Sequence, residues 1–462
     1  MILPFGDPPS GAPRGLLLAA PASGSGKTTL TLALLRCQRN AGIAVSSVKV
    51  GPDYIDPAFH RAASGRACFN LDGWAMRPQT LAAALDVAGQ GAELILGEGV
   101  MGLFDGAPLA GEQGLAAGST AELAALTGWP VVLVVDCKGM GASIAALAQG
   151  FVRFHDGIDV VGVILNNVAS PRHEALLCSA CNAAGLDVFG AVARDPALAR
   201  PSRHLGLVQA DEDADLDNFL EAAAAGVAAQ VDVDALRAAA RPSRQAIAPA
   251  ATQPPPMQPP IAPLGQRIAV AADLAFAFAY PLLLTAWRRA GVDILPFSPL
   301  ADEAPDKTAD AVYLPGGYPE LHAGRLAGNA GFLDGLRAAA ARGATVYGEC
   351  GGYMVLGQGL EDAEGGRHAM AGLLPLESSF KAPQRHLGYR RAVALAAGPL
   401  GPKGTAFRGH EFHYARVVGA EGPVETALFH AAPAAGGTPS AVGQRSDGVS
   451  GSFLHLIDRE TI

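Results

Sequence analysis

A glycine-rich turn near the start of the chain constrains its fold more than any other feature. Residues 16–20 are all Leu or Ala and predict a buried strand, whereas the segment that opens at Lys27 predicts a helix. Glycines let backbone N–H groups point at a phosphate beside the positive end of the helix dipole, and Lys27 adds a charge. The pattern G-x-x-x-x-G-K-[ST] is incomplete because Pro21 replaces its first glycine. Strand, turn and helix still follow in the expected order, so we predict a nucleotide-binding loop in a parallel α/β sheet.

The loop supplies backbone amides, hydroxyls and one ammonium group for phosphate binding. The Thr28 hydroxyl is the predicted Mg²⁺ contact. The alternative is a glycine-rich turn without a ligand, which this strand–turn–helix context disfavours. The predicted nucleotide-binding residues are Gly24, Ser25, Gly26, Lys27, Thr28 and Thr29.

Length and charge limit the class of protein. At 462 residues the chain is too long for one average domain, and two domains of about 200 residues are expected. The formal net charge of −9 argues against nonspecific binding of nucleic acid. No apolar run is long enough to span a membrane and the first residues lack a signal-peptide pattern, so we expect a soluble cytoplasmic protein with no membrane partner.

A second strand, expected over residues 44–50, runs into Gly51-Pro52-Asp53-Tyr54-Ile55-Asp56-Pro57. Open α/β sheets bind ligands at the carboxyl ends of their parallel strands. Lys49, Asp53 and Asp56 are therefore candidate site residues. The alternative is a Pro-Asp turn in which Asp56 caps the next helix.

A third strand, expected over residues 93–96, ends beside Glu98. In phosphate-binding α/β proteins an acidic residue at this place completes the Mg²⁺ shell or positions the attacking group, and we assign that role to Glu98. Asp105 can reach the same site. Asp136, at the end of the apolar strand 131–136, is a rival to Glu98, although we favour a turn-capping role for it.

An asparagine pair follows the strand expected over residues 161–165. Side-chain amides both donate and accept, as recognition of a purine edge requires, so Asn166 or Asn167 is a candidate base contact. A turn role is equally compatible with the pair. Arg203 and His204 are further candidate contacts for phosphate or carboxylate.

A proline-rich tract divides the chain. Eight prolines occur within residues 242–263, a composition that behaves as an extended spacer. We therefore predict an N-terminal domain over residues 1–241, a linker over 242–265 and a C-terminal domain over 266–462.

The C-terminal half alternates strands and helices again, and its strand 345–347 leads into Gly348-Glu349-Cys350-Gly351-Gly352. A G-x-C-x-G turn between strand and helix exposes the sulfur beside a helix N-terminus, which favours the thiolate. Cys350 is thus a candidate nucleophile and His455 its candidate base. Backbone amides at Gly316, Gly317 and Gly351 are the candidate oxyanion hole.

Three other patterns have two interpretations each. His410 and His413 could bind metal, but their alternating segment favours neutral histidines on a strand. Cys178 and Cys181 form an isolated C-x-x-C, which we interpret as two buried thiols on a helix. The basic stretch Lys381–Arg391 is either a solvated loop or a surface for a polycarboxylate.

Taken together, these motifs resemble the family of cobyrinic acid and hydrogenobyrinic acid a,c-diamide synthases along nearly the whole chain. The segment KVGPDYIDP is the most specific of them. The resemblance rests on APASGSGKTT, KVGPDYIDPAFH, EGVMGLFDG, ILNNV, RHLGLV, PGGYPE, YGECGGYMVLG, HLGYR, GHEFHY and GSFLHL.

The resemblance implies a P-loop domain similar to dethiobiotin synthetase, fused to a class I glutamine amidotransferase domain with an α/β/α fold. It implies that Cys350 attacks glutamine, that ATP and Mg²⁺ activate a corrin carboxylate as an acyl phosphate, and that ammonia displaces the phosphate. The implied substrate side comprises Tyr54, Asp56, Glu98 and Asp105, beside the strand-end candidate Lys49. An asparagine of the pair is implied at the adenine, and we assign Asn167. The implied Mg²⁺ ligands are Thr28, Glu98 and one of Asp53 and Asp56, of which we assign Asp53.

The family pattern has one departure and several competitors. Class I amidotransferases usually carry Glu two residues after the histidine, where this chain has Ile457.

A partitioning-type ATPase switch is disfavoured by Ala22, where such switches carry lysine. CTP synthase, cobyric acid synthase and a Ni-sirohydrochlorin a,c-diamide synthase are the competing ligases. The partners expected are small molecules, namely a corrin polycarboxylate, glutamine and ATP, and a homodimer is left open.

Overall fold

The structure is a computed structural model that describes residues 13–108, 114–198, 208–244, 258–418 and 424–460. The chain forms two compact units. Unit 1 comprises Met1–Trp74 and Leu81–Pro254, and unit 2 comprises Ala75–Thr80 and Pro255–Ile462. Among the described residues no helix has both the length and the apolar character needed to cross a membrane.

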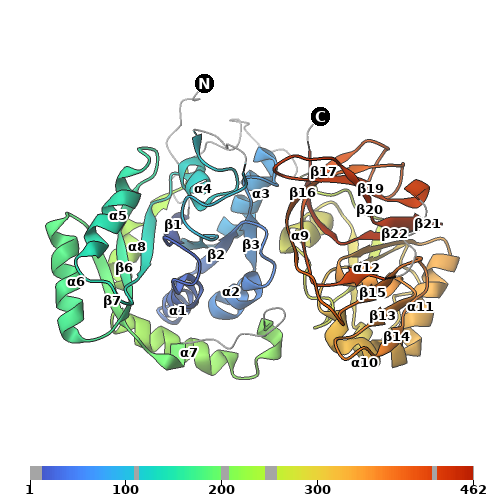
Figure 1. Cartoon of the computed structure of the whole chain (residues 1–462), viewed down its shortest axis with the longest axis horizontal. Coiled ribbons are helices and arrows are strands. Elements are labelled where there is room, and N and C mark those ends of the chain that lie inside the picture. Colours follow the sequence, from blue (N-terminus) through green and yellow to red (C-terminus); the bar gives the residue numbers. More distant parts are fainter. Residues whose placement is uncertain (1–12, 109–113, 199–207, 245–257, 419–423, 461–462) are drawn as a thin grey trace. The chain divides into compact units, whose positions relative to one another are not determined.

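Unit 1 is built on a parallel sheet with strand order β3-β2-β4-β1-β5-β6-β7 (Figure 1). A short strand, β8 (Arg241–Pro242), pairs antiparallel with β1, so the start of the predicted linker belongs to this sheet. The main strands are β1 (Arg14–Ala19), β2 (Val45–Val50), β3 (Cys68–Leu71), β4 (Leu94–Glu98), β5 (Val131–Asp136), β6 (Val160–Val168) and β7 (Val188–Ala193).

Helices connect successive strands of unit 1. The crossovers through α1 and α2 run along the sheet in one direction and those through α4, α5 and α6 in the other, so right-handed connections place the two groups on opposite faces. The helices are α1 (Lys27–Asn40), α2 (Asp56–Ser64), α3 (Pro78–Gly89), α4 (Thr120–Thr127), α5 (Ser143–Arg153), α6 (Pro171–Ala183), α7 (Leu216–Ala228) and α8 (Val233–Ala239).

The sheet of unit 1 is buried on both faces. All side chains of β2 are buried, as are those of β1 after its first residue, and apart from Lys49 these buried residues are apolar or small. Its central strands β1 and β4 pair in register from Arg14 with Leu94 to Leu18 with Glu98. This pairing brings the phosphate loop after β1 next to the acidic end of β4.

Unit 2 contains a mainly parallel sheet of order β10-β9-β11-β12-β22-β21. Its elements are β9 (Arg267–Ala271), α9 (Pro281–Arg289), β10 (Asp293–Phe297), β11 (Ala311–Leu314), α10 (Ala323–Gly328), α11 (Ala330–Ala341), β12 (Thr345–Glu349), α12 (Gly351–Leu356), β21 (Gln444–Ser446) and β22 (Val449–Ser452). A core cluster of this unit surrounds α11 and α12 and includes Phe332, Leu336 and Met354.

Two smaller sheets complete unit 2. The antiparallel sheet, of order β20-β19-β16-β17-β23, carries the histidine-rich segments. Its strands are β16 (His386–Ala394), β17 (Ala406–His413), β19 (Phe429–Pro433), β20 (Ser440–Val442) and β23 (Leu454–Arg459); the other sheet has β13 (Gly359–Glu361), β14 (Arg367–Ala369), β15 (Glu377–Ser379) and β18 (Arg416–Val417).

Candidate active site

The phosphate loop has the geometry that its glycines predict. Gly24 and Gly26 adopt left-handed conformations with φ of 79° and 90°, which side-chain-bearing residues rarely reach. The Lys27 ammonium group donates hydrogen bonds to the carbonyl oxygens of Met101 at 2.6 Å and Ala22 at 3.4 Å. Burial lowers the pKa of Lys27. The loop is therefore preformed, with its lysine held by backbone carbonyls.

A buried polar network lies directly behind the loop. Oε1 of Glu98 accepts from Thr28 Oγ1 and from Lys49 Nζ, both at 2.6 Å, and Lys49 also reaches Asp56 Oδ2 at 2.7 Å. Burial opposes charge on Lys49 and Glu98, but their attraction outweighs it, so the pKa of Lys49 is raised and that of Glu98 is lowered. The structure thus brings Thr28, Glu98, Lys49 and Asp56 together.

Asp53 and Asp105 have mainly backbone partners. Asp53 Oδ1 accepts from the N–H groups of Ile55 at 2.8 Å and Asp56 at 3.1 Å, as in the predicted turn. Burial and the nearby Asp56 raise the pKa of Asp53 to about 7. Asp105 Oδ2 accepts from the N–H of Gly102 at 2.8 Å, and Tyr54 is buried.

His60 is a member of this network that the sequence reasoning missed. Its Nε2 lies 2.7 Å from Glu98 Oε2, and its Nδ1 lies 3.6 Å from Cys68 Sγ. Burial lowers the pKa of His60, but Cys68 and Glu98 outweigh it and bring the pKa to about 10. The available signal was its spacing of four residues from Asp56, which places both on one face of α2.

The asparagine pair lies inside β6, not after it as predicted. Asn166 Nδ2 donates to the Ser25 carbonyl at 2.9 Å, so it is this residue that contacts the phosphate loop. Asn167 has a φ of 59° and donates to Asp136 Oδ1 at 2.9 Å. Asp136 also accepts from the N–H of Lys138 at 3.1 Å, as a turn-capping residue does. Arg203 and His204 lie outside the described residues.

Cys350 occupies a sharp turn between β12 and α12. Its φ of 47° and ψ of −106° are strained for a non-glycine residue, as expected of the predicted G-x-C-x-G turn between strand and helix. Its N–H donates to the Ser452 carbonyl at 2.8 Å, and its Sγ lies 3.7 Å from the Phe412 carbonyl oxygen. Burial and the nearby Glu320 raise the pKa of the thiol, which opposes the bias toward thiolate expected from the turn.

His455 and the glycines of the PGG turn pack around the cysteine turn. A Cβ on Gly316 would come 2.2 Å from His455 Cε1, and a Cβ on Gly351 would come 3.0 Å from the Gly317 nitrogen. His455 is fully buried, and burial together with His410 and His413 lowers its pKa to about 3. The imidazole is therefore neutral at pH 7.

Glu349, which precedes the cysteine, also escaped the sequence reasoning. Its carboxyl accepts from Tyr313 Oη at 2.8 Å, Tyr347 Oη at 3.2 Å and the N–H of Leu456 at 3.2 Å. Burial raises its pKa to about 7. Because Leu456 follows His455 directly, Glu349 holds the strand that carries the histidine, whose usual Glu partner is replaced by Ile457.

Three further predictions concern the histidine pair, the C-x-x-C motif and the basic stretch. His410 and His413 lie on β17 as predicted, and burial lowers the pKa of His410 to about 4. Cys178 and Cys181 lie on α6, but only Cys181 is fully buried. The basic stretch becomes strand β16 from His386 onward, where Arg390 pairs with Glu411 and Arg391 with Glu460. These arginines are therefore neutralised within the unit.

Comparison with known proteins agrees with both halves of the fold. Residues 16–208 match the CobQ/CobB/MinD/ParA nucleotide binding domain, and residues 267–461 match the CobB/CobQ-like glutamine amidotransferase domain. The chain is 54% identical to hydrogenobyrinate a,c-diamide synthase of Brucella abortus over 96% of this chain and 98% of the relative. It is also 54% identical to that of Rhodobacter capsulatus, over 97% and 99%, and 50% identical to that of Rhizobium meliloti, over 96% and 99%.

The fold and the domain matches therefore define a class of protein in which a nucleotide-binding domain is fused to a glutamine amidotransferase domain. Within that class, this chain belongs to the hydrogenobyrinate a,c-diamide synthase family.

Proposed function

We propose that this protein uses ATP and glutamine to convert the a and c acetate carboxylates of the corrin hydrogenobyrinic acid into amides, in cobalamin biosynthesis. The observation that carries the proposal is the similarity, over 96% of the chain, to relatives named for this reaction. Both candidate sites fall inside the matched domains. The reaction joins carbon to nitrogen, so the protein is a ligase.

In unit 2, Cys350 attacks the side-chain amide carbon of glutamine. The raised pKa of the thiol and the lowered pKa of His455 mean that both groups start neutral, so His455 accepts the proton as the carbon–sulfur bond forms. Backbone amides of Gly316, Gly317 and Gly351 stabilise the oxyanion. Ammonia leaves, and water then hydrolyses the thioester to glutamate.

In unit 1, the ATP γ-phosphate is transferred to a carboxylate of the corrin, because a carboxylate oxygen is otherwise too poor a leaving group. Gly24, Gly26 and Lys27 bind the phosphates, and Asn167 is the proposed adenine contact. Ammonia attacks the acyl carbon and phosphate departs, which leaves an amide. Tyr54, Asp56 and Asp105 are the proposed contacts on the corrin side, with Lys49 countering the negative charge.

The donor chemistry beside the loop fits Mg²⁺. Thr28 Oγ1 and Glu98 Oε1 lie 2.6 Å apart, and hydroxyl and carboxylate oxygens are the ligands that this ion prefers. Thr28, Glu98 and Asp53 are the residues that would hold it. When bound, Mg²⁺ supplies charge neutralisation for the transferred phosphoryl group.

The test separates the two halves of the reaction. The Cys350→Ser variant should lose glutamine-supported amidation of hydrogenobyrinic acid but keep amidation supported by ammonium, since unit 1 consumes free ammonia. Products are weighed by mass spectrometry. Loss of both activities in a folded variant would contradict this division of labour.

A further inference from the structure

A buried histidine on α2 contacts the carboxyl group that lies beside Thr28 of the phosphate loop. His60 Nε2 lies 2.7 Å from Glu98 Oε2, and both side chains are almost completely buried. The other oxygen of this carboxyl, Oε1, lies 2.6 Å from Thr28 Oγ1 and 2.6 Å from Lys49 Nζ. His60 therefore contacts one oxygen of Glu98 while the hydroxyl and ammonium groups contact the other.

The imidazole of His60 is itself held in place. Its Nδ1 lies 3.6 Å from Cys68 Sγ on β3, and its backbone carbonyl accepts a hydrogen bond from Ser64 Oγ at 2.8 Å within α2. The side chain is fully buried. A packed ring with a neighbour at each nitrogen has one orientation, so it can hold its partner in one orientation too.

The carboxyl group of Glu98 needs a contact on each oxygen to fix its plane. The last torsion of a glutamate side chain is broad and roughly two-fold, so contacts to Oε1 alone leave the plane free to turn. The contact between His60 and Oε2 removes this freedom and keeps Oε1 beside Thr28. Carboxylates that bind metal ions are commonly oriented by hydrogen bonds of this kind.

The same face of α2 contacts both members of the Lys49–Glu98 ion pair. His60 and Asp56 are four residues apart on this helix and share one face. Asp56 Oδ2 lies 2.7 Å from Lys49 Nζ, while His60 reaches Glu98. The position of α2 thus sets the orientation of the lysine through Asp56 and that of the glutamate through His60.

We propose that His60 is a positioning residue that orients the Glu98 carboxylate toward Mg²⁺ beside the bound nucleotide. The inference rests on the proposed function, in which Thr28 and Glu98 hold this ion. His60 acts through Glu98 and contacts no substrate in this role. Its loss should weaken the contribution of Mg²⁺ to nucleotide binding, because partners of metal ligands change metal affinity by about 10–100-fold.

The experiment measures binding of the non-hydrolysable ATP analogue AMP-PNP to the full chain by titration calorimetry, once with Mg²⁺ and once with EDTA. The ratio of the two Kd values is the contribution of Mg²⁺ to binding. His60→Leu should lower this ratio by about tenfold or more and leave the Kd in EDTA like that of the parent. His60→Gln keeps a side-chain N–H that can reach Glu98 and should restore most of the ratio.

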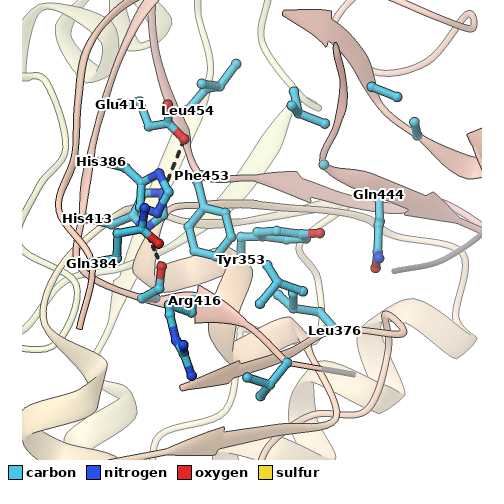
Figure 2. A pocket seen from close by; sticks show the side chains of 17 residues that line it. Tyr353, Leu376, Gln384, His386, Glu411, His413, Arg416, Gln444, Phe453 and Leu454 are labelled. Carbon is cyan, nitrogen blue, oxygen red and sulfur yellow. Dashed lines mark hydrogen bonds and ion pairs between the residues drawn. The ribbon is translucent and has the colours of Figure 1, made fainter. Parts of the chain in front are cut away.

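Two control variants separate positioning from folding. Phe59→Leu alters the packing of a buried neighbour on α2, so it should lower the Tm without changing the ratio. His413→Leu removes a second histidine–glutamate contact, in unit 2, where His413 Nε2 lies 3.2 Å from Glu411 Oε1. Figure 2 shows this pair, which lines a cavity of about 600 Å³. Because that pair lies in the other unit, His413→Leu should leave the ratio at the parent value.

Three results would overturn the inference. The first is an unchanged ratio in His60→Leu with circular dichroism like that of the parent, or no effect of Mg²⁺ on the parent itself. The second is a ratio for His60→Gln no higher than that for His60→Leu. The third is an equal fall in Phe59→Leu, because the effect would then come from the packing of α2. Failure of the proposed function is distinguishable, since Mg²⁺ would strengthen AMP-PNP binding through His60 while the parent formed no amide from hydrogenobyrinic acid.

Discussion

Lys49 Nζ lies 2.6 Å from Glu98 Oε1, and both side chains are almost completely buried. β2 and β4 are adjacent parallel strands that pair Lys49 with Glu98 in register, so the contact follows from the sheet topology. It holds two candidate residues of the phosphoryl site in one position before any substrate binds. The ion pair therefore contributes to the stability of unit 1 and also positions residues of the proposed phosphoryl site.

Replacing Lys49 by Met should therefore lower both the stability of the protein and its ammonium-supported amidation activity. Removal of Lys49 leaves Asp56 without its cation and Glu98 with His60 as its remaining charged partner, which costs about 3–5 kcal/mol of unfolding free energy. Denaturant unfolding measures this loss, and ammonium-supported amidation should fall with it. The control is Arg61→Ala, which breaks an exposed pair with Asp211 and should cost less than about 1 kcal/mol. Equal effects of the two variants would refute the structural role of Lys49.

Gly316→Ala should selectively impair glutamine use. The added Cβ would meet His455 Cε1 at 2.2 Å and push the imidazole away from the cysteine turn. We expect glutamine-supported turnover to fall by about 10²-fold, since small misplacements of catalytic groups have effects of this size. Ammonium-supported turnover serves as the internal reference. Gly328→Ala, whose Cβ meets no neighbouring atom, is the matched control and should behave like the parent.

The raised pKa of Cys350 predicts slow alkylation of the free enzyme at neutral pH. Only the thiolate reacts, and below its pKa the thiolate fraction grows about tenfold per pH unit. Iodoacetamide labelling of the Cys350 peptide, followed by mass spectrometry, should accelerate steadily from pH 6 to pH 9. A rate that is already at its plateau at pH 6 would show a preformed thiolate and refute the neutral starting pair.

Glu349 predicts a specific dependence of stability on pH. Its pKa is raised to about 7 in the folded protein from the ordinary value of 4.5, so between these values the folded state binds the extra proton. Stability contributed by this group is therefore present at low pH and lost as pH rises toward 7, with a limiting slope of about 1.4 kcal/mol per pH unit. The destabilisation caused by Glu349→Gln should shrink across that interval in denaturant unfolding.

Local patterns made much of the fold and part of the site predictable. The turn at Gly24–Gly26 is encoded by its glycines, because other residue types rarely tolerate the backbone angles required. The sharp turn at Cys350 is marked in the sequence by the glycines that flank it. β5 begins and ends where the sequence predicts, since it is an almost completely buried apolar run that ends at a turn.

Features that depend on neighbours in space were harder to predict. His60 gains its partner only because β4 brings Glu98 beside α2, and Glu349 contacts Leu456 across more than a hundred residues. The pKa of Cys350 is governed by burial, which the G-x-C-x-G pattern does not encode. His386 and His413 meet through the register of β16 and β17, which the alternation of either strand alone does not specify.

The central claim is that nitrogen released from glutamine in unit 2 becomes the amide nitrogen of the corrin in unit 1. The most direct measurement supplies ATP, Mg²⁺, hydrogenobyrinic acid and glutamine labelled with ¹⁵N in its side-chain amide, and weighs the product by mass spectrometry. The account predicts a diamide in which both new nitrogens carry the label. An unchanged corrin, or a diamide without label, would contradict it.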